Sequence, residues 1–205
     1  MSSPGYILVV DDIPDILNLL DTTLKFKGYR VVTARNGQEA LDVIQKESPA
    51  LVIADILMPI MDGFSLVHHL RINSQTRQIP VVFLSATYVA PEDKEFALAI
   101  GVTKFIEKPV DIESFLPMVS ELVTEKSSLA HKTISEFEFY DWYRKRLETK
   151  LHQKNGQIAR SEHLLSTQSA EEKPMIIQTL ETARAEQKDI LHLLDQVRER
   201  LNKVK

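Results

Sequence analysis

Three aspartates, a serine and a lysine are the residues of this sequence best suited to chemistry. They are Asp11, Asp12, Asp55, Ser85 and Lys108, and each follows a short apolar run. Three carboxylates brought close together repel one another unless a cation joins them. Carboxylate oxygens without histidine or cysteine suit Mg²⁺. A carboxylate beside Mg²⁺ can attack a phosphoryl group, and a lysine and a hydroxyl can then offset the charge on the phosphoryl oxygens.

Residues 1–125 contain the elements that must bring these side chains together. Five short runs are apolar throughout, as strands covered on both faces are, and helix-period segments alternate with them. The expected strands are Tyr6–Val10, Tyr29–Thr33, Leu51–Ala54, Val81–Leu84 and Lys104–Ile106, and the expected helices cover residues 14–27, 37–46, 63–72, 91–100 and 111–125. This alternation predicts an α/β fold with a doubly wound, five-stranded parallel sheet. Functional residues gather at the carboxyl ends of the strands of such a sheet, where all five candidates lie. This convergence disfavours the alternative that the aspartates only cap helices and solvate loops.

Residues 126–205 show only helical patterns and are predicted to form a separate helical hairpin. One long helix is expected from near Thr133 to near Ser166, weakened at Asn155-Gly156, and a second one ends near Val204. The second helix has a coiled-coil seam, completed by Gln187, because its apolar residues alternate at spacings of four and three. The predicted seam consists of Ile176, Leu180, Ala183, Ile190, Leu194, Val197 and Leu201. One hairpin buries little surface, so we expect a homodimer through these helices, in the form of a four-helix bundle.

Composition excludes several classes of protein. The chain has 205 residues, no cysteine and a formal net charge of −4. Disulfides and thiol chemistry are therefore excluded. The mild negative charge argues against broad electrostatic capture of DNA. No apolar run approaches the roughly 20 residues that a membrane span needs, and no signal peptide is visible, so we expect a cytoplasmic protein without membrane contact.

Four motifs carry a resemblance to a known family. The stretches Ile7–Pro14 (ILVVDDIP), Asp55–Gly63 (DILMPIMDG) and Val81–Ala86 (VVFLSA), together with Lys108-Pro109, resemble the receiver domains of response regulators in two-component signal transduction. The motifs occur in the usual order and spacing over residues 5–125. The resemblance implies a flavodoxin-like sheet of strand order 2-1-3-4-5. It also implies a phosphorelay in which a sensor histidine kinase or a phosphotransfer protein is the phosphodonor.

The resemblance implies a chemical role for five of these residues. Asp55 would be the phosphoacceptor, and it would hold Mg²⁺ together with Asp11, Asp12 and the backbone carbonyl of Leu57. Lys108 would pair with Asp55 or with its phosphoryl group. The protein would then catalyse only its own phosphorylation and dephosphorylation and would not be an enzyme with a separate substrate.

Three further residues would form the switch that the resemblance implies. Ser85 would supply the switch hydroxyl and Phe105 the aromatic ring that changes rotamer with it, while Pro109 would follow a cis peptide bond. Ser85 stands where threonine is more frequent in the family, and Phe105 stands where tyrosine is common. Neither difference affects the phosphotransfer chemistry.

Alternative functions are distinguished by particular residues. Phosphatases and haloacid-hydrolase-like enzymes also use an aspartate nucleophile, but they need an acidic residue where this chain has Leu57. The helical tail could instead act on DNA or RNA polymerase, which would make the chain a transcriptional regulator. A phosphohistidine in the tail is disfavoured because His163 lacks the flanking residues of such sites. The tail's aromatic residues suit either a partner-binding patch or internal packing, and they are Phe137, Phe139, Tyr140, Trp142 and Tyr143.

Overall fold

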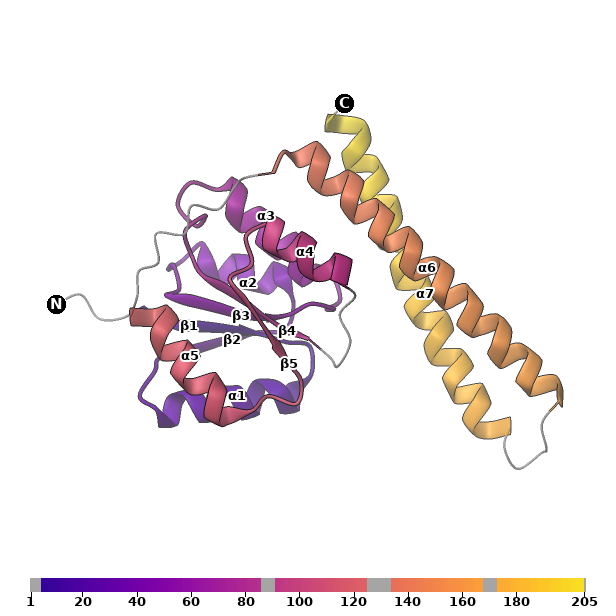
Figure 1. Ribbon diagram of the computed structural model, residues 1–205, viewed down its shortest axis with the longest axis horizontal. Coiled ribbons are helices and arrows are strands. Elements are labelled where there is room, and N and C mark those ends of the chain that lie inside the picture. The colour runs from indigo at the N-terminus through magenta and orange to yellow at the C-terminus, as the bar shows by residue number, and fades with distance from the viewer. Residues whose placement is uncertain (1–4, 86–90, 125–133, 168–172, 205) are drawn as a thin grey trace. The chain divides into compact units, whose positions relative to one another are not determined.

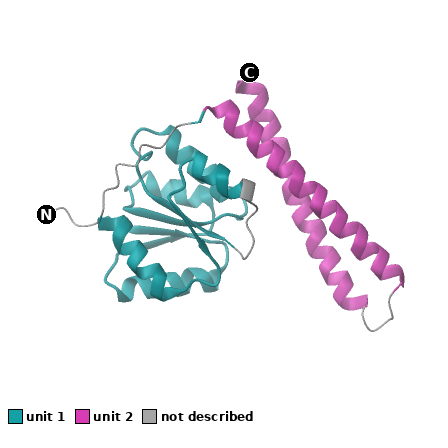
Figure 2. Ribbon diagram, viewed as in Figure 1, with its two compact units in different colours: residues 1–134 teal, residues 135–205 magenta. Residues whose placement is uncertain are grey.

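A parallel β-sheet organises residues 1–134, the first of two units in the computed structural model (Figures 1 and 2). The structure describes residues 5–85, 91–124, 134–167 and 173–204. The strands run parallel in the order β2-β1-β3-β4-β5, which confirms the predicted flavodoxin-like topology. They are β1 (Ile7–Val10), β2 (Val31–Ala34), β3 (Leu51–Asp55), β4 (Val81–Ser85) and β5 (Lys104–Glu107).

Helices cover both faces of the sheet (Figure 1). One face carries α1 (Pro14–Phe26) and α5 (Ile112–Thr124), and the other carries α2 (Gly37–Ile44), α3 (Gly63–Ile72) and α4 (Pro91–Ala99). Every residue of β1, β3 and β4 is buried. Burial on both faces explains why these strands are apolar throughout rather than alternating. The three central strands therefore end in a rigid edge from which polar side chains can be positioned accurately.

Side-chain caps start two helices directly at that edge. Asn36 accepts a hydrogen bond from the backbone of Glu39 at the start of α2, and Asp62 accepts one from Ser65 at the start of α3. Such caps satisfy backbone N–H groups that have no partner within the helix. They also determine where the β2–α2 and β3–α3 loops end, and these loops flank the candidate site.

A buried arginine links α3 to the segments that precede β4 and β5. Arg71 donates hydrogen bonds to the carbonyls of Gly101, Arg77 and Ile79, at 2.7, 3.1 and 2.9 Å. Burial lowers the pKa of Arg71 to about 10. A guanidinium can serve several carbonyls at once because its donors are held in a planar fork. Arg71 thus holds in place the segments that lead into β4 and β5.

A buried histidine on α3 should make the first unit sensitive to acid. His68 is only 2% exposed. Burial, followed by the charge of His69, lowers the pKa of His68 to about 4. Because the folded pKa lies below the unfolded value, the neutral imidazole stabilises the fold fully above the unfolded pKa, and this contribution is lost as the pH falls through about 4.

Replacing His68 should flatten that pH dependence. Between about pH 7 and pH 4 we expect the free energy of unfolding of His68→Gln to fall less than that of the wild type, by on the order of 3 kcal/mol. Chemical denaturation at both pH values measures the difference. His152→Gln is the matched control because His152 is exposed. Equal pH dependence in the two variants would contradict the prediction.

Two long antiparallel helices, α6 (Glu136–Thr167) and α7 (Lys173–Val204), form the second unit, residues 135–205 (Figure 2). The predicted hairpin is therefore present, although the predicted start near Thr133 lies outside the described residues. α6 runs through the predicted weak point, Asn155-Gly156, without a break. Asn155 accepts a hydrogen bond of 2.7 Å from Gln187, which ties this part of α6 to α7.

The heptad seam of α7 is largely buried within this one chain. Gln187, in the middle of the seam, bonds to α6, so the seam faces the other helix of the hairpin. Its buried members are Leu180, Ala183, Leu194, Val197 and Leu201, while Ile176 and Ile190 are half-buried. These residues hold the hairpin together, and their use in a dimer stays a prediction. Part of the aromatic cluster packs on itself, because the ring of Phe139 lies 5.2 Å from that of Tyr140 and 5.6 Å from that of Tyr143.

Candidate functional site

One ammonium group joins two carboxylates at the carboxyl edge of the sheet. The Nζ atom of Lys108, just after β5, lies 2.8 Å from Asp11 Oδ2 and 2.6 Å from Asp55 Oδ1. Asp11 follows β1 and Asp55 ends β3, so the three side chains come from three strands of the sheet. The backbone holds both carboxylates from the other side, because Asp11 Oδ1 accepts from Ile13 N and Asp55 Oδ2 accepts from Leu57 N. The structure thus brings together three of the five predicted residues by direct contact.

Asp55 and Asp11 are buried carboxylates whose negative charges are stabilised by a nearby cation. Asp11 is fully buried and Asp55 is 9% exposed. Burial raises the pKa of Asp55, Lys108 opposes that rise, and the charge of Asp11 adds to it. Burial alone would lower the pKa of Lys108, but its bonds to Asp11 and Asp55 outweigh burial and raise it. The lysine is therefore held as an ammonium between two carboxylates that water solvates poorly.

The residues fit a hard divalent cation in charge and ligand type. Asp11, Asp12 and Asp55 together with Lys108 carry a formal charge of −2, as the three carboxylates and one ammonium imply. Oxygen ligands alone are what Mg²⁺ prefers. Asp12 is exposed beside the buried Asp11, so it can turn toward solvent or toward an ion. Within the described ranges, no three acidic, histidine or cysteine side chains are already gathered as a metal site.

The β3–α3 loop wraps closely around Asp55 because two glycines allow it. A Cβ atom on Gly63 would lie 2.5 Å from the carbonyl oxygen of Asp55 and 3.0 Å from the ring of Phe83. A Cβ atom on Gly37 would lie 2.7 Å from the side chain of Met61, in the middle of this loop. The Gly63 amide also donates to the carbonyl of Ile56, at 2.9 Å. A glycine at position 63 is thus required for close packing against the acceptor residue.

The predicted switch residues lie beside this cluster. Ser85 is buried at the end of β4, and its carbonyl accepts a 2.7 Å hydrogen bond from Lys108 N. The Lys108-Pro109 bond is cis, as predicted. The ring of Phe105 lies 5.7 Å from that of Phe83, edge to face. Rotamer changes in Ser85 and Phe105 are not tested by a single structure and stay predictions.

An aromatic ladder behind Phe105 was not predicted from the sequence. Phe83 contacts Phe64 at 5.3 Å between ring centroids, and Phe64 contacts Phe96 at 5.6 Å. The rings belong in turn to β5, β4, α3 and α4. Alternation on β4 could have placed Phe83 on the face opposite Val82 and Leu84, but its partners on α3 and α4 depend on tertiary packing.

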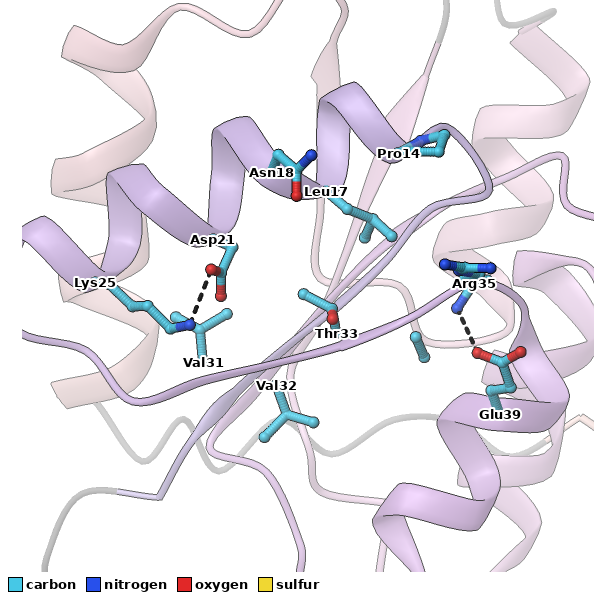
Figure 3. Close-up of a pocket in the computed structure, with 11 residues that line it drawn as sticks. Pro14, Leu17, Asn18, Asp21, Lys25, Val31, Val32, Thr33, Arg35 and Glu39 are labelled. Carbon is cyan, nitrogen blue, oxygen red and sulfur yellow. Dashed lines mark hydrogen bonds and ion pairs between the residues drawn. The ribbon is translucent and has the colours of Figure 1, made fainter.

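A pocket of about 490 Å³ lies away from this cluster, between α1 and the edge strand β2 (Figure 3). It is lined by polar residues that include Asn18, Thr33 and Arg35, and by an ion pair of 2.9 Å between Asp21 and Lys25. Neither Asp55 nor Lys108 lines it. The candidate functional site therefore lies at the carboxyl edge of the sheet and not in this pocket.

Comparison with known proteins agrees with the geometry. The family model for the response regulator receiver domain matches residues 7–120, more than half of the 205-residue chain. The chain belongs to the response regulator receiver family. The chemotaxis response regulator CheY4 of Vibrio cholerae aligns with a TM-score of 0.54 and 35% identity over 58% of this chain and 99% of that one.

Two sequence relatives each match about half of this chain. A 14.6 kDa protein of Leptolyngbya boryana is 38% identical over 56% of this chain and 87% of its own length. The probable transcriptional regulator ycf27 of Porphyra purpurea is 41% identical over 50% of this chain, but only 41% of ycf27 is covered. The match to the family model ends at residue 120, before α6 begins. In the described parts of the chain, no helix is long and apolar enough to cross a membrane.

The close contact at Gly63 gives a direct test of how the acceptor is held. Gly63→Ala should push the β3–α3 loop away from Asp55, which should lower the free energy of unfolding by about 2 kcal/mol and slow phosphorylation of Asp55. Gly156→Ala is the matched control, since its nearest neighbour would be 3.8 Å away. In a helix interior the same substitution should stabilise by about 0.5–1 kcal/mol. Chemical denaturation distinguishes the two signs, and a neutral Gly63→Ala would contradict the prediction.

Proposed function

We propose that this response regulator accepts a phosphoryl group on Asp55 from a phosphohistidine and signals through altered association of its helical tail. The donor would be a sensor histidine kinase or a phosphotransfer protein. The observation that carries the proposal is the Lys108 ammonium between Asp11 and Asp55, at 2.8 and 2.6 Å. The chain would act as a phosphoacceptor and would catalyse only its own phosphorylation and dephosphorylation.

Transfer of the phosphoryl group to Asp55 forms one bond to phosphorus and breaks one. A carboxylate oxygen of Asp55 forms the new bond to phosphorus while the bond between phosphorus and the donor's imidazole nitrogen breaks, and the electron pair stays on that nitrogen. Lys108 already bonds to Asp55, so its ammonium can shift to a phosphoryl oxygen and offset the new charge. The Ser85 hydroxyl, buried at the end of the neighbouring strand, would donate to another phosphoryl oxygen.

Mg²⁺ would be held by Asp11, Asp12, Asp55 and the carbonyl of Leu57. When bound, it would neutralise the buried carboxylates and polarise the phosphoryl group. The raised pKa of Asp55 supports this assignment, because burial and the charge of Asp11 oppose the ionised form that attacks. The contribution of the chain is to keep these oxygens at one edge of the sheet.

Exposed apolar side chains next to the acceptor suit a protein donor. Ile13, Leu57 and Ile60 are 46%, 60% and 73% exposed, and they lie on the loops that follow β1 and β3. Ile60 also has a φ of 68°, a conformation that β-branched residues rarely adopt. A protein donor that covered these side chains would remove their apolar surface from water, which is favourable.

The output would be a population shift that starts at Ser85. Its hydroxyl would move toward the phosphoryl group and Phe105 would follow. The ring contacts from Phe105 through Phe83 and Phe64 to Phe96 offer a packed route to α3 and α4. The tail would then change its association with a partner.

Intact mass spectrometry tests the phosphotransfer. After incubation with acetyl phosphate and Mg²⁺, the wild type should gain the mass of one phosphoryl group. The gain should disappear in EDTA and in Asp55→Asn, because the first lacks the cation and the second the nucleophile. Lys104→Gln is the control, since Lys104 pairs only with the exposed Glu121 among the contacts shown. Phosphorylation of Asp55→Asn to the wild-type extent would contradict the assignment.

The phosphorylated form should be long-lived. Leu57 is 60% exposed and has no group that can orient an attacking water. Leu57→Asn would supply one, and we expect it to speed loss of the phosphoryl group by roughly tenfold, or about 1.4 kcal/mol in the barrier. Time-resolved mass spectrometry after removal of acetyl phosphate measures the decay. Equal rates in the two proteins would refute this role of Leu57.

Transcriptional control through the tail is the second candidate, because ycf27 is a probable transcriptional regulator. The family match ends at residue 120, so this candidate depends on what α6 and α7 bind. A DNA shift assay over a range of salt concentrations distinguishes it, since phosphate contacts weaken steeply with salt.

A further inference from the structure

β2 is an edge strand, since β1 is its only neighbour in the described sheet. Asp11, just after β1, donates from its N–H to the Ala34 carbonyl at 3.2 Å, so Ala34 turns its backbone toward β1. Backbone groups alternate along a strand, so Val31 and Thr33 turn their N–H and C=O groups outward. Among the described residues, no partner for these outward groups is shown. Such a row of unpaired groups is a template for another extended chain.

The pocket of about 490 Å³ follows this free edge (Figure 3). The whole run from Val31 to Arg35 lines it, together with one flank of α1 and Glu39 of α2. Val31 points toward α1, because it packs in the same core cluster as Leu17 of that helix. Val32 points to the opposite face, because side chains alternate along a strand. Residues of both faces line the pocket, so it runs along the edge of β2 rather than over one face of the sheet.

The four residues of β2 lack the charges that often protect a sheet edge. Their sequence is Val-Val-Thr-Ala, which is rich in residues that favour strands. β5, at the other edge, begins with Lys104 and ends with Glu107, and both residues make ion pairs with neighbouring helices. Charges on an edge strand discourage pairing with another chain. The sheet is therefore protected at β5 and open to pairing at β2.

The carboxylate of Glu39 ends the free edge at Arg35. The N–H of Arg35 is the next outward donor after Thr33, and Glu39 Oε2 accepts from it at 2.9 Å. Glu39 Oε1 accepts from the side chain of Asn36 at 3.2 Å, so both oxygens of this carboxylate are in use. An added chain can therefore bond to Val31 and Thr33 but not to the N–H of Arg35, which limits it to a short segment.

One charge in the pocket selects the chemistry of the added chain. Lys25 pairs with Asp21 at 2.9 Å, and the two donors just described hold Glu39. Among the described residues, no partner is shown for the guanidinium of Arg35, the remaining charged group of the lining. A guanidinium binds a carboxylate in a defined geometry because two of its N–H groups can donate at once. The pocket therefore fits a chain with an acidic side chain opposite Arg35.

We propose that the edge of β2 binds a short, extended, acidic segment of another protein as an additional strand. Main-chain hydrogen bonds to Val31 and Thr33 would hold the segment, and its carboxylate would bond to Arg35. The segment would be antiparallel to β2, because antiparallel pairs are slightly more stable per residue than parallel ones. This surface does not depend on phosphotransfer, since neither Asp55 nor Lys108 lines the pocket.

An NMR titration of the full, isotope-labelled chain tests the surface with a defined peptide. The probe is acetyl-Glu-Val-Thr-Val-Val-amide, whose antiparallel pairing places its glutamate opposite Arg35 and its threonine opposite Thr33. Binding should shift the amide signals of Val31 and Thr33 and slow their hydrogen exchange, because both groups leave water. The same peptide with lysine in place of glutamate should bind roughly tenfold more weakly. No change at these two amides up to millimolar peptide, or equal binding of the two peptides, would overturn the proposal.

Substitutions in the protein separate the backbone contribution from the charge. Thr33→Pro removes an outward N–H that does not bond to β1, so it should raise the dissociation constant roughly tenfold. Thr33→Ala keeps that N–H and should bind like the wild type. Arg35→Gln should lose the preference for glutamate over lysine, whereas Lys27→Gln should keep it, since Lys27 is exposed and does not line the pocket. Equal binding by both Thr33 variants, or a preference that persists in Arg35→Gln, would contradict the proposal.

A modified peptide tests the same pairing without any change to the protein. Methylation of the peptide's threonine nitrogen removes the N–H that would donate to the Thr33 carbonyl. The dissociation constant should rise roughly tenfold, because one main-chain hydrogen bond is lost and the methyl group blocks close approach. Unchanged binding of the methylated peptide would show that the backbone edge is not the contact and would overturn the proposal.

Discussion

The contact of one ammonium with two buried carboxylates is the interaction on which the arrangement of this protein depends. Lys108 can reach both Asp11 and Asp55 only because β1, β3 and β5 are parallel and end at the same edge. Removing any of the three charges would leave the others poorly solvated, since Asp11 has no exposed surface. The strand order keeps these groups within hydrogen-bond distance.

Close packing surrounds Asp55 as well. Gly63 lies against the backbone of the acceptor and against Phe83, and Phe83 in turn contacts Phe105 and Phe64. A displacement at the acceptor must therefore be taken up by aromatic rings that are packed edge to face. Close-packed interiors transmit such displacements because they contain little free volume.

Much of the fold and of the candidate site could be predicted from the sequence, because strands buried on both faces are apolar throughout. The strand order followed from the receiver motifs, and the meeting of Asp11, Asp55 and Lys108 followed from the rule that parallel strands end together. The contact of Lys108 with Asp11, the buried Arg71 and the partners of Phe83 could not be predicted, because each depends on distances between elements remote in sequence. In the tail, heptad spacing located the seam of α7. It could not distinguish burial against α6 from burial against a second chain.

The hydrogen bond between Asn155 and Gln187, in the middle of the hairpin, has a mechanical consequence. Asn155 bonds to Gln187 across the two helices. Sliding α6 along α7 by one heptad would place Asn155 level with Leu180 or Leu194, and it would break this bond together with the ion pairs Arg184–Glu162 and Lys154–Glu186. The two helices therefore resist sliding much more than they resist moving together. A displacement applied at Glu136 would be carried along both helices as the tilt or rotation of a single stiff rod.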